Sequence, residues 1–257
     1  MAYIEIKNAC KTYHQAGKSV TVLDQVSLDI HKGEFICLLG PSGCGKSTLL
    51  NALAGFEKPD SGIIKIDEKE VFEPSEKNIT IFQNYGLLAW RNVLKNVELG
   101  LEAKIKDRSE RKKTARKYLN LVCLGEYEKR YPKQLSGGQQ QRVAIARGLA
   151  VDPDIIFMDE PFGALDAITR MKLQDDILKI SKEEKKTIIF VTHDIEEAVF
   201  LADKIVVMMA DPGRIKSIVK VPLGEHRNRT GSDFLYVRDK IFELFNLKTE
   251  EYIDYVI

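Results

Sequence analysis

Polar and apolar residues follow a strand-like pattern in several parts of the chain. They alternate over residues 3–6 and 20–30, which predicts two strands near the N-terminus. Short apolar stretches predict further strands at 63–66 and 79–82. Continuous apolar runs are typical of strands that are buried on both faces of a sheet. Such runs occur at 35–39, 155–158, 187–191 and 205–209.

A helical pattern, with apolar residues three and four positions apart, fills the middle of the chain. Val93, Val97 and Leu101 form one stripe, and a second stripe runs through 115–122. Strands and helices then alternate, which predicts an α/β fold with a mostly parallel sheet and helices on both faces. Further helices are expected at 168–180, 195–202 and 234–245. The expected division is one domain over 1–257, with a core of 1–84 and 154–223, an inserted helical subdomain at 85–153 and a helical tail at 224–257.

Composition narrows the class of protein. The 257 residues are 44% hydrophobic and 30% charged, which is typical of a globular protein with one large core. The net charge of +1 gives no basic field for nucleic acid, so no nucleic-acid partner is expected. No signal pattern begins the chain, and no apolar run approaches the ~20 residues of a membrane helix. Four cysteines without metal-type spacing indicate reduced thiols. We therefore expect a cytosolic protein, or one that reaches a membrane only through a partner.

A glycine-rich phosphate-binding loop lies between the apolar run 35–39 and the next helical pattern. Its residues are Gly40, Pro41, Ser42, Gly43, Cys44, Gly45, Lys46, Ser47 and Thr48. The glycines let successive N–H groups ring an anion, and the following helix adds its free N–H groups. Lys46 supplies a positive charge for the β- and γ-phosphates, and the Ser47 hydroxyl is placed to ligate Mg²⁺. A glycine-rich turn in an α/β core is the structural alternative, but the pattern in this context predicts binding of a nucleoside triphosphate.

Two carboxylates follow the apolar run 155–158. Ligands gather beyond the carboxyl ends of parallel strands, which is where this run delivers Asp159 and Glu160. Asp159 suits the role of holding Mg²⁺ beside Ser47, and Glu160 suits the role of orienting and deprotonating the attacking water. Taken alone, such a pair is more often a turn or a helix cap. The phosphate-binding loop in the same chain favours the catalytic role.

A second unusual stretch precedes the helical run at 140–150. It consists of Leu135, Ser136, Gly137, Gly138 and Gln139. The pattern Ser-x-x-Gln fits a capping box, and a helix cap is the structural alternative. Two adjacent glycines nevertheless cost a helix about 1 kcal/mol each relative to alanine. Bare backbone at a helix N-terminus is useful where an anion approaches closely, so these residues predict a second anion site.

The chain resembles the ATP-binding cassette (ABC) ATPases over nearly its whole length. The motifs above occur in the family's order, together with Gln83 after a strand, the triplet Ala164-Leu165-Asp166, and His193 after the run 187–192. The resemblance implies a P-loop NTPase core with an antiparallel β subdomain and an inserted α-helical subdomain. It also implies hydrolysis of ATP with Mg²⁺ in a head-to-tail dimer, formed with a second copy or a paralogous ATPase. In that dimer the second anion site completes the ATP site of the opposite subunit.

The resemblance also assigns roles to single positions. Gln83 senses Mg²⁺ and the γ-phosphate, and His193 contacts the γ-phosphate. Asp166 lies across the dimer seam, and Tyr13, expected in a polar turn between the first two strands, stacks on adenine. The alternative for Tyr13 is an ordinary surface residue without a ligand. The alternative for His193 is a histidine whose hydrogen bonds are purely structural. The implied catalytic set is Glu160, His193, Gln83 and Lys46, and the implied metal set is Ser47, Gln83 and Asp159. The implied nucleotide-binding set is Tyr13, Gly40 to Thr48, Gln83, Ser136 to Gln139, Asp166 and His193.

The stretch after Gln83 is a candidate docking site for a partner. Leu87, Leu88 and Trp90 lie in a loop-like segment, and internal packing is an equally good explanation for each. In ABC importers this region receives a helix of the membrane permease. Residues 83–97, 159–170 and 192–215 resemble the ATPase subunits of nitrate, sulfonate, taurine and bicarbonate importers, although Ala89 stands where that subgroup often has proline.

The resemblance therefore implies a peripheral ATPase subunit at the cytoplasmic face of the membrane. It would drive uptake of a small anion through a separate permease, with an extracytoplasmic solute-binding protein as an indirect partner. An exporter subunit, or an importer subunit for another solute, is the alternative. A soluble ABC protein of translation or DNA repair would carry two cassettes or long insertions, which are not present here. A P-loop GTPase or kinase is disfavoured by the stretch at 135–139 and by the lack of a guanine-reading Asn-Lys-x-Asp pattern.

Overall fold

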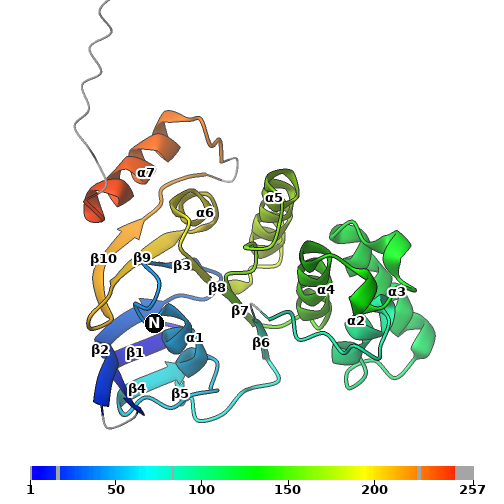
Figure 1. Ribbon diagram of the computed structural model, residues 1–257, viewed down its shortest axis with the longest axis horizontal. Coiled ribbons are helices and arrows are strands. Elements are labelled where there is room, and N and C mark those ends of the chain that lie inside the picture. Colours follow the sequence, from blue (N-terminus) through cyan, green and yellow to red (C-terminus); the bar gives the residue numbers. More distant parts are fainter. Residues whose placement is uncertain (1, 16–17, 83, 225–226, 247–257) are drawn as a thin grey trace, which may run out of the picture.

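The computed structural model describes residues 2–15, 18–82, 84–224 and 227–246. Within these ranges the chain forms a six-stranded sheet in the order β10-β9-β3-β8-β7-β6 and a four-stranded sheet in the order β2-β1-β4-β5. Figure 1 shows the two sheets beside each other, with α1 between them and α2, α3 and α4 grouped beyond β6. The expected α/β fold with a mostly parallel sheet is confirmed.

The six-stranded sheet is parallel except at one edge. Its parallel strands are β3 (Phe35–Leu39), β6 (Asn78–Ile81), β7 (Ile155–Asp159), β8 (Thr187–Thr192) and β9 (Lys204–Met209). β10 (Arg214–Lys220) pairs antiparallel with β9 at the edge. The sequence reasoning missed β10 because its residues are mostly polar and its faces are half-exposed. All the parallel strands point the same way, so their carboxyl ends form one rim.

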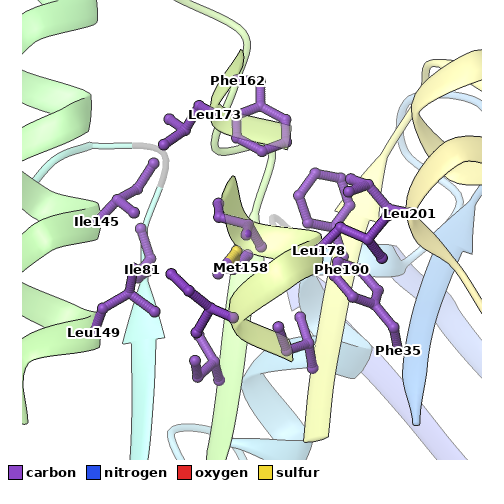
Figure 2. Close-up of a cluster of buried hydrophobic side chains, with 14 of the residues drawn as sticks. Phe35, Ile81, Ile145, Leu149, Met158, Phe162, Leu173, Leu178, Phe190 and Leu201 are labelled. Atoms are coloured by element: carbon purple, nitrogen blue, oxygen red, sulfur yellow. The ribbon is translucent and has the colours of Figure 1, made fainter. Parts of the chain in front are cut away.

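Alternate residues of the central strands enter two separate cores. Ile36 and Leu38 of β3 and Phe157 of β7 pack with α1 (Lys46–Leu53) and the four-stranded sheet. Their neighbours Phe35 and Met158 pack in the opposite core, with the remaining helices. Figure 2 shows this second core, in which Ile145 and Leu149 of α4 approach Ile81 of β6. The strands are therefore covered on both faces, as their continuous apolar runs predict.

The four-stranded sheet is antiparallel. It consists of β1 (Ile4–Gln15), β2 (Lys18–Ile30), β4 (Ser61–Ile66) and β5 (Lys69–Glu70). β5 was not expected because it is only two charged residues long. The prediction that Tyr13 lies in a turn was wrong, because Tyr13 belongs to β1 and pairs with Val20 of β2. Strand pairing continues beyond Tyr13 to Gln15 and Lys18, so the ring of Tyr13 projects from a sheet.

The helices fall into two groups. The middle of the chain folds into α2 (Val93–Leu101), α3 (Arg108–Leu121), two short 3₁₀ helices (Gly125–Tyr127 and Pro132–Gln134) and α4 (Gly137–Ala150). α5 (Ala167–Glu183), α6 (Ile195–Leu201) and α7 (Ser232–Leu244) follow. Within the described ranges, every helix is too short or too polar to cross a lipid bilayer.

Candidate functional site

The loop between β3 and α1 is shaped by its glycines. Gly43 and Gly45 have φ of +81° and +90°, a region that side chains other than glycine rarely adopt. A Cβ on Gly45 would also lie 2.7 Å from the Val22 carbonyl oxygen, and one on Gly40 would lie 2.7 Å from the Met208 carbonyl oxygen. α1 begins directly after Gly45 without a side-chain cap. Its first N–H groups are thus available to an anion.

Lys46 lies across this loop with little contact with solvent, since it is 6% exposed. Its Nζ donates hydrogen bonds to the carbonyl oxygens of Gly40 at 2.8 Å and Pro41 at 2.9 Å. The Cys44 side chain is buried against the same amine, and burial raises the pKa of its thiol. Both carbonyl acceptors are neutral, and a phosphate oxygen makes a stronger, charge-assisted bond with an ammonium group. Lys46 is thus positioned to bind phosphate.

A hydroxyl and a carboxylate meet at the end of β7. The Ser47 hydroxyl donates to Asp159 Oδ1 at 3.0 Å. Burial raises the pKa of Asp159, the Ser47 bond lowers it, and the charge of Glu160 raises it. A bound cation would offset this burial, and oxygen donors of this kind are those that Mg²⁺ prefers. Within the described ranges, His, Cys, Asp and Glu side chains do not gather in groups of three or more that could hold a metal ion.

Glu160 and His193 face each other at the rim of the sheet. Glu160 Oε1 lies 3.2 Å from His193 Nδ1, and the Glu160 N–H donates to the Val191 carbonyl oxygen at 3.1 Å. Glu160 has φ of +45°, so the chain leaves β7 in a left-handed conformation. His193 stays 63% exposed, which leaves Nε2 open to a ligand. A carboxylate beside an imidazole can accept a proton from water and be held in place while it does so.

Apart from His193, which contacts Glu160 from outside the lining, these groups share one open cleft of about 480 Å³. It is lined by Tyr13, Val22, Ser42, Gly43, Gly45, Lys46, Ser47, Thr48, Asp159 and Glu160. The Tyr13 hydroxyl donates to Glu57 Oε2 at 2.6 Å, which fixes the ring at the edge of the cleft. The structure thus brings together the phosphate loop, the acidic pair and the tyrosine. Gln83 lies outside the described residues.

Ser136 to Gln139 do not line this cleft. They form the expected capping box at the start of α4: the Gln139 N–H donates to Ser136 Oγ, and the Ser136 N–H donates to Gln139 Oε1. A Cβ on Gly138 would lie 2.9 Å from the Ala164 carbonyl oxygen, so close packing within the chain also requires glycine there. The sequence reasoning did not include this packing. Ser136 and Gly137 remain exposed, with the free end of α4 facing outward.

Asp166 is the N-cap of α5. Its Oδ1 accepts from the Thr169 N–H at 3.0 Å, and this bond lowers the pKa of its carboxyl group. The residue is exposed at the end of the loop that begins with Glu160. It does not line the cleft of its own chain either.

The loop after residue 83 is held by two residues that the sequence reasoning missed. Arg147 of α4 donates to the carbonyl oxygens of Tyr85 at 3.0 Å and Gly86 at 2.6 Å. Asn96 of α2 is fully buried. It binds the backbone of Leu88 in both directions and donates to two further carbonyls of the same loop. In the sequence, Asn96 is a polar residue beside the apolar stripe of α2, and this position could have indicated a buried, hydrogen-bonding role.

The candidate docking residues differ in their exposure to solvent. Leu87 packs against the core beside the helical subdomain, and Leu88 is half-buried. The Trp90 ring is 75% exposed. Since Asn96 fixes the backbone on either side, Trp90 projects from a clamped loop.

Comparison with known proteins places these features in a family. The family described as ABC transporter matches residues 23–163. An uncharacterized ABC transporter ATP-binding protein of Methanocaldococcus jannaschii is 49% identical, over 94% of this chain and 90% of its own length. A bicarbonate transport ATP-binding protein of Synechocystis is 43% identical, over 89% and 82%. An aliphatic sulfonates import ATP-binding protein of Bacillus thuringiensis is 42% identical, over 94% and 95%.

A solved structure resembles most of the fold. It is a dimeric, post-hydrolysis state of an ATP-binding cassette bound to ADP and phosphate. It superimposes with a TM-score of 0.80 at 36% identity, and the match covers 86% of this chain and 100% of that chain.

Proposed function

The chain belongs to the ABC transporter family and is an ATPase, and we propose that it drives uptake of a small anion through a separate membrane permease. The observation that carries the proposal is the single cleft that gathers Lys46, Ser47, Asp159 and Glu160, with His193 bound to Glu160. Relatives named for bicarbonate and sulfonate transport support the choice of an importer and of an anionic solute. Nitrate, sulfonates, taurine and bicarbonate are the solutes to test first.

We assign separate tasks in hydrolysis to residues of the cleft, to His193 beside it and to Gln83. The loop N–H groups and Lys46 bind the β- and γ-phosphates, and Tyr13 supports the adenine ring. Ser47 and Asp159 would hold Mg²⁺, which supplies positive charge to the phosphates when bound. Glu160 accepts the proton of the attacking water, and His193 holds Glu160 and reaches the γ-phosphate. Gln83 is assigned to the same step as a sensor of Mg²⁺ and the γ-phosphate.

The arrangement of Ser136 to Gln139 supports a head-to-tail dimer. Ser136, Gly137 and Asp166 are exposed, and none of the residues 136–139 or Asp166 lines the cleft of its own chain. A second copy, or a paralogous subunit, would bring its Ser136 against the γ-phosphate and its Asp166 across the seam. The dimeric state of the solved cassette supports this assembly. Closure around ATP would then exclude water and allow hydrolysis to be gated by assembly.

The exposed Trp90, with Leu87 and Leu88 behind it, is proposed to receive the permease at the cytoplasmic face of the membrane. Its clamped loop lies next in sequence to Gln83 and is bound through Arg147 to α4, the helix whose N-cap is Ser136. Movement of α4 during closure would thus be transmitted to the permease through Arg147. An extracytoplasmic solute-binding protein would deliver the solute from the other side.

Transport by the intact complex tests the proposal. The tagged chain is purified from its native cells with its bound membrane subunits, and the complex is reconstituted in liposomes with ATP. We expect ATP-dependent movement of one of the four solutes towards the ATP side, and none with Glu160→Gln. Movement away from the ATP side would establish an exporter. A complex without any membrane subunit would contradict a transport function.

A further inference from the structure

A chain of polar side chains runs through the core behind His193. Thr192 ends β8, Glu197 lies on α6 and Gln174 lies on α5, and their exposed fractions are 2%, 7% and 1%. Buried polar groups are costly unless they are hydrogen-bonded. The side chains of all three make such bonds, and they make them with one another.

Glu197 is the centre of this chain of bonds. Its Oε2 accepts from the Thr192 hydroxyl at 2.8 Å, and its Oε1 accepts from Gln174 Nε2 at 3.2 Å. Gln174 Oε1 in turn accepts from Arg229 Nη2 at 2.5 Å. Arg170 approaches Glu197 Oε1 to 3.8 Å without a hydrogen bond. The carboxylate is thus fixed from two sides by neutral donors, with two arginines nearby.

Glu197 also holds both neighbours of His193, Thr192 through its carboxylate and Asp194 through its backbone N–H. Thr192 Oγ1, which donates to Glu197, also accepts from the Asp194 N–H at 3.0 Å. Asp194 Oδ1 accepts from the Glu197 N–H at 3.1 Å and so caps α6. The turn that carries His193 therefore has little freedom. The result is visible at the site, where His193 Nδ1 lies 3.2 Å from Glu160.

Arg229 is the far end of the chain of bonds. It precedes α7, and its guanidinium stacks on the Phe200 ring with the carbon 3.6 Å from the ring centroid. Stacking and partial burial hold the guanidinium plane in one orientation. The nearby Arg227 donates to the Phe200 and Ala202 carbonyl oxygens at the end of α6. The segment before α7 is therefore attached to the helix that begins beside His193.

We propose that Arg229, acting through Gln174 and Glu197, is a positioning residue that holds the His193 turn in its hydrolytic geometry. The proposal rests on the role given to His193 above and adds a control of that residue from the segment before α7. Arg229 does not touch the phosphate loop, so it acts on the rate of hydrolysis and leaves ATP binding unchanged. A displacement of about 1 Å at a catalytic group can cost up to ~10²-fold in rate.

The test uses the full chain and two kinds of variant. Arg229→Met keeps an unbranched apolar stem but removes the donor to Gln174, and Arg229→Lys keeps a charged donor. Thr192→Val removes the hydroxyl at the other end, and Thr192→Ser retains it. We expect Arg229→Met and Thr192→Val to lower kcat about 10-fold with KM for ATP within about twofold, and Thr192→Ser to keep most activity. Circular dichroism and thermal melting check that each variant is folded.

A double-mutant cycle separates positioning from stability. Each variant is combined with His193→Ala, and single-turnover hydrolysis is measured at saturating ATP. If Arg229 acts through His193, Arg229→Met should change the rate of the His193→Ala chain by less than about twofold. The same loss in both backgrounds, a normal kcat in Arg229→Met, or a parallel rise in KM would overturn the proposal.

If His193→Ala itself hydrolyses ATP normally, the role of His193 falls as well. An impaired His193→Ala with a normal Arg229→Met would refute only the role of Arg229. Should Arg229→Met be unfolded, Arg229→Gln is carried through the same cycle, and the same outcomes decide.

Discussion

Replacement of Lys46 by methionine is the sharpest test of the phosphate site. The two hydrogen bonds of Lys46 Nζ, at 2.8 and 2.9 Å, go to loop carbonyls that a phosphate can replace. Methionine keeps the apolar stem within the buried loop but removes the charge and all three donors. A hydrogen bond to a charged group contributes about 1.5–3 kcal/mol. A net loss of about 2–3 kcal/mol raises the Kd for ATP about 30- to 150-fold.

Titration calorimetry with MgATP, MgADP and adenosine measures the effect. The loss should be large for ATP, smaller for ADP, and minimal for adenosine, because adenosine lacks the phosphates that Lys46 binds. Lys240→Met, on the exposed surface of α7, is the matched control and should bind ATP like the unaltered chain. An unchanged ATP isotherm for a folded Lys46→Met would refute the phosphate-loop assignment. An equal loss for adenosine would show that the loop had collapsed.

Three further predictions concern the acids of the cleft and the docking loop. Glu160→Gln should still bind ATP but accumulate a nucleotide-trapped dimer, and normal turnover in a phosphate-release assay would remove Glu160 from its role. Asp159→Asn should stabilise the nucleotide-free chain at neutral pH, because burial raises the pKa of Asp159 above its value of 3.8 in the unfolded chain. Between pH 3.8 and the raised pKa of the folded chain, the folded chain binds more protons at Asp159 than the unfolded chain does. The free energy of unfolding therefore falls as pH rises through this window, and the loss persists at higher pH. Urea unfolding at pH 3 and pH 7 should therefore show a gain only at pH 7, and a gain at both would refute this cause. Trp90→Ala should keep the ATPase activity of the chain but uncouple transport in liposomes, whereas loss of folding would show that the ring is structural.

The strands of the central sheet could be predicted because burial on both faces leaves continuous apolar runs in the sequence. β7 and β8 are examples, and the acidic pair after β7 followed from its position at the rim. β10 could not be predicted in this way because an exposed edge strand shows neither a continuous run nor a clean alternation. Tyr13 was placed in a turn for a similar reason, since the polar end of a long hairpin resembles a loop.

Contacts between distant residues explain what the sequence reasoning missed at the site. Arg229 and Gln174 are 55 positions apart, and Gln174 and Glu197 are 23 apart, so their bonds depend on how α5 and α6 pack. The glycine at 138 was attributed to an approaching anion, although the nearby Ala164 carbonyl also requires it. Local patterns thus indicated which residues form the cleft proposed to bind the ligand, but not which residues hold them in place.

Complementation between two inactive variants tests most directly whether one ATP site is built from two chains. Lys46→Met disables the phosphate loop, and Ser136→Asp places a negative charge where the γ-phosphate is proposed to lie while keeping a good helix cap. Each variant alone should be inactive. When the two are mixed, the mixed dimer contains one intact site, formed by Lys46 of one chain and Ser136 of the other, and ATP hydrolysis should return. A mixture as inactive as its components would contradict the shared site.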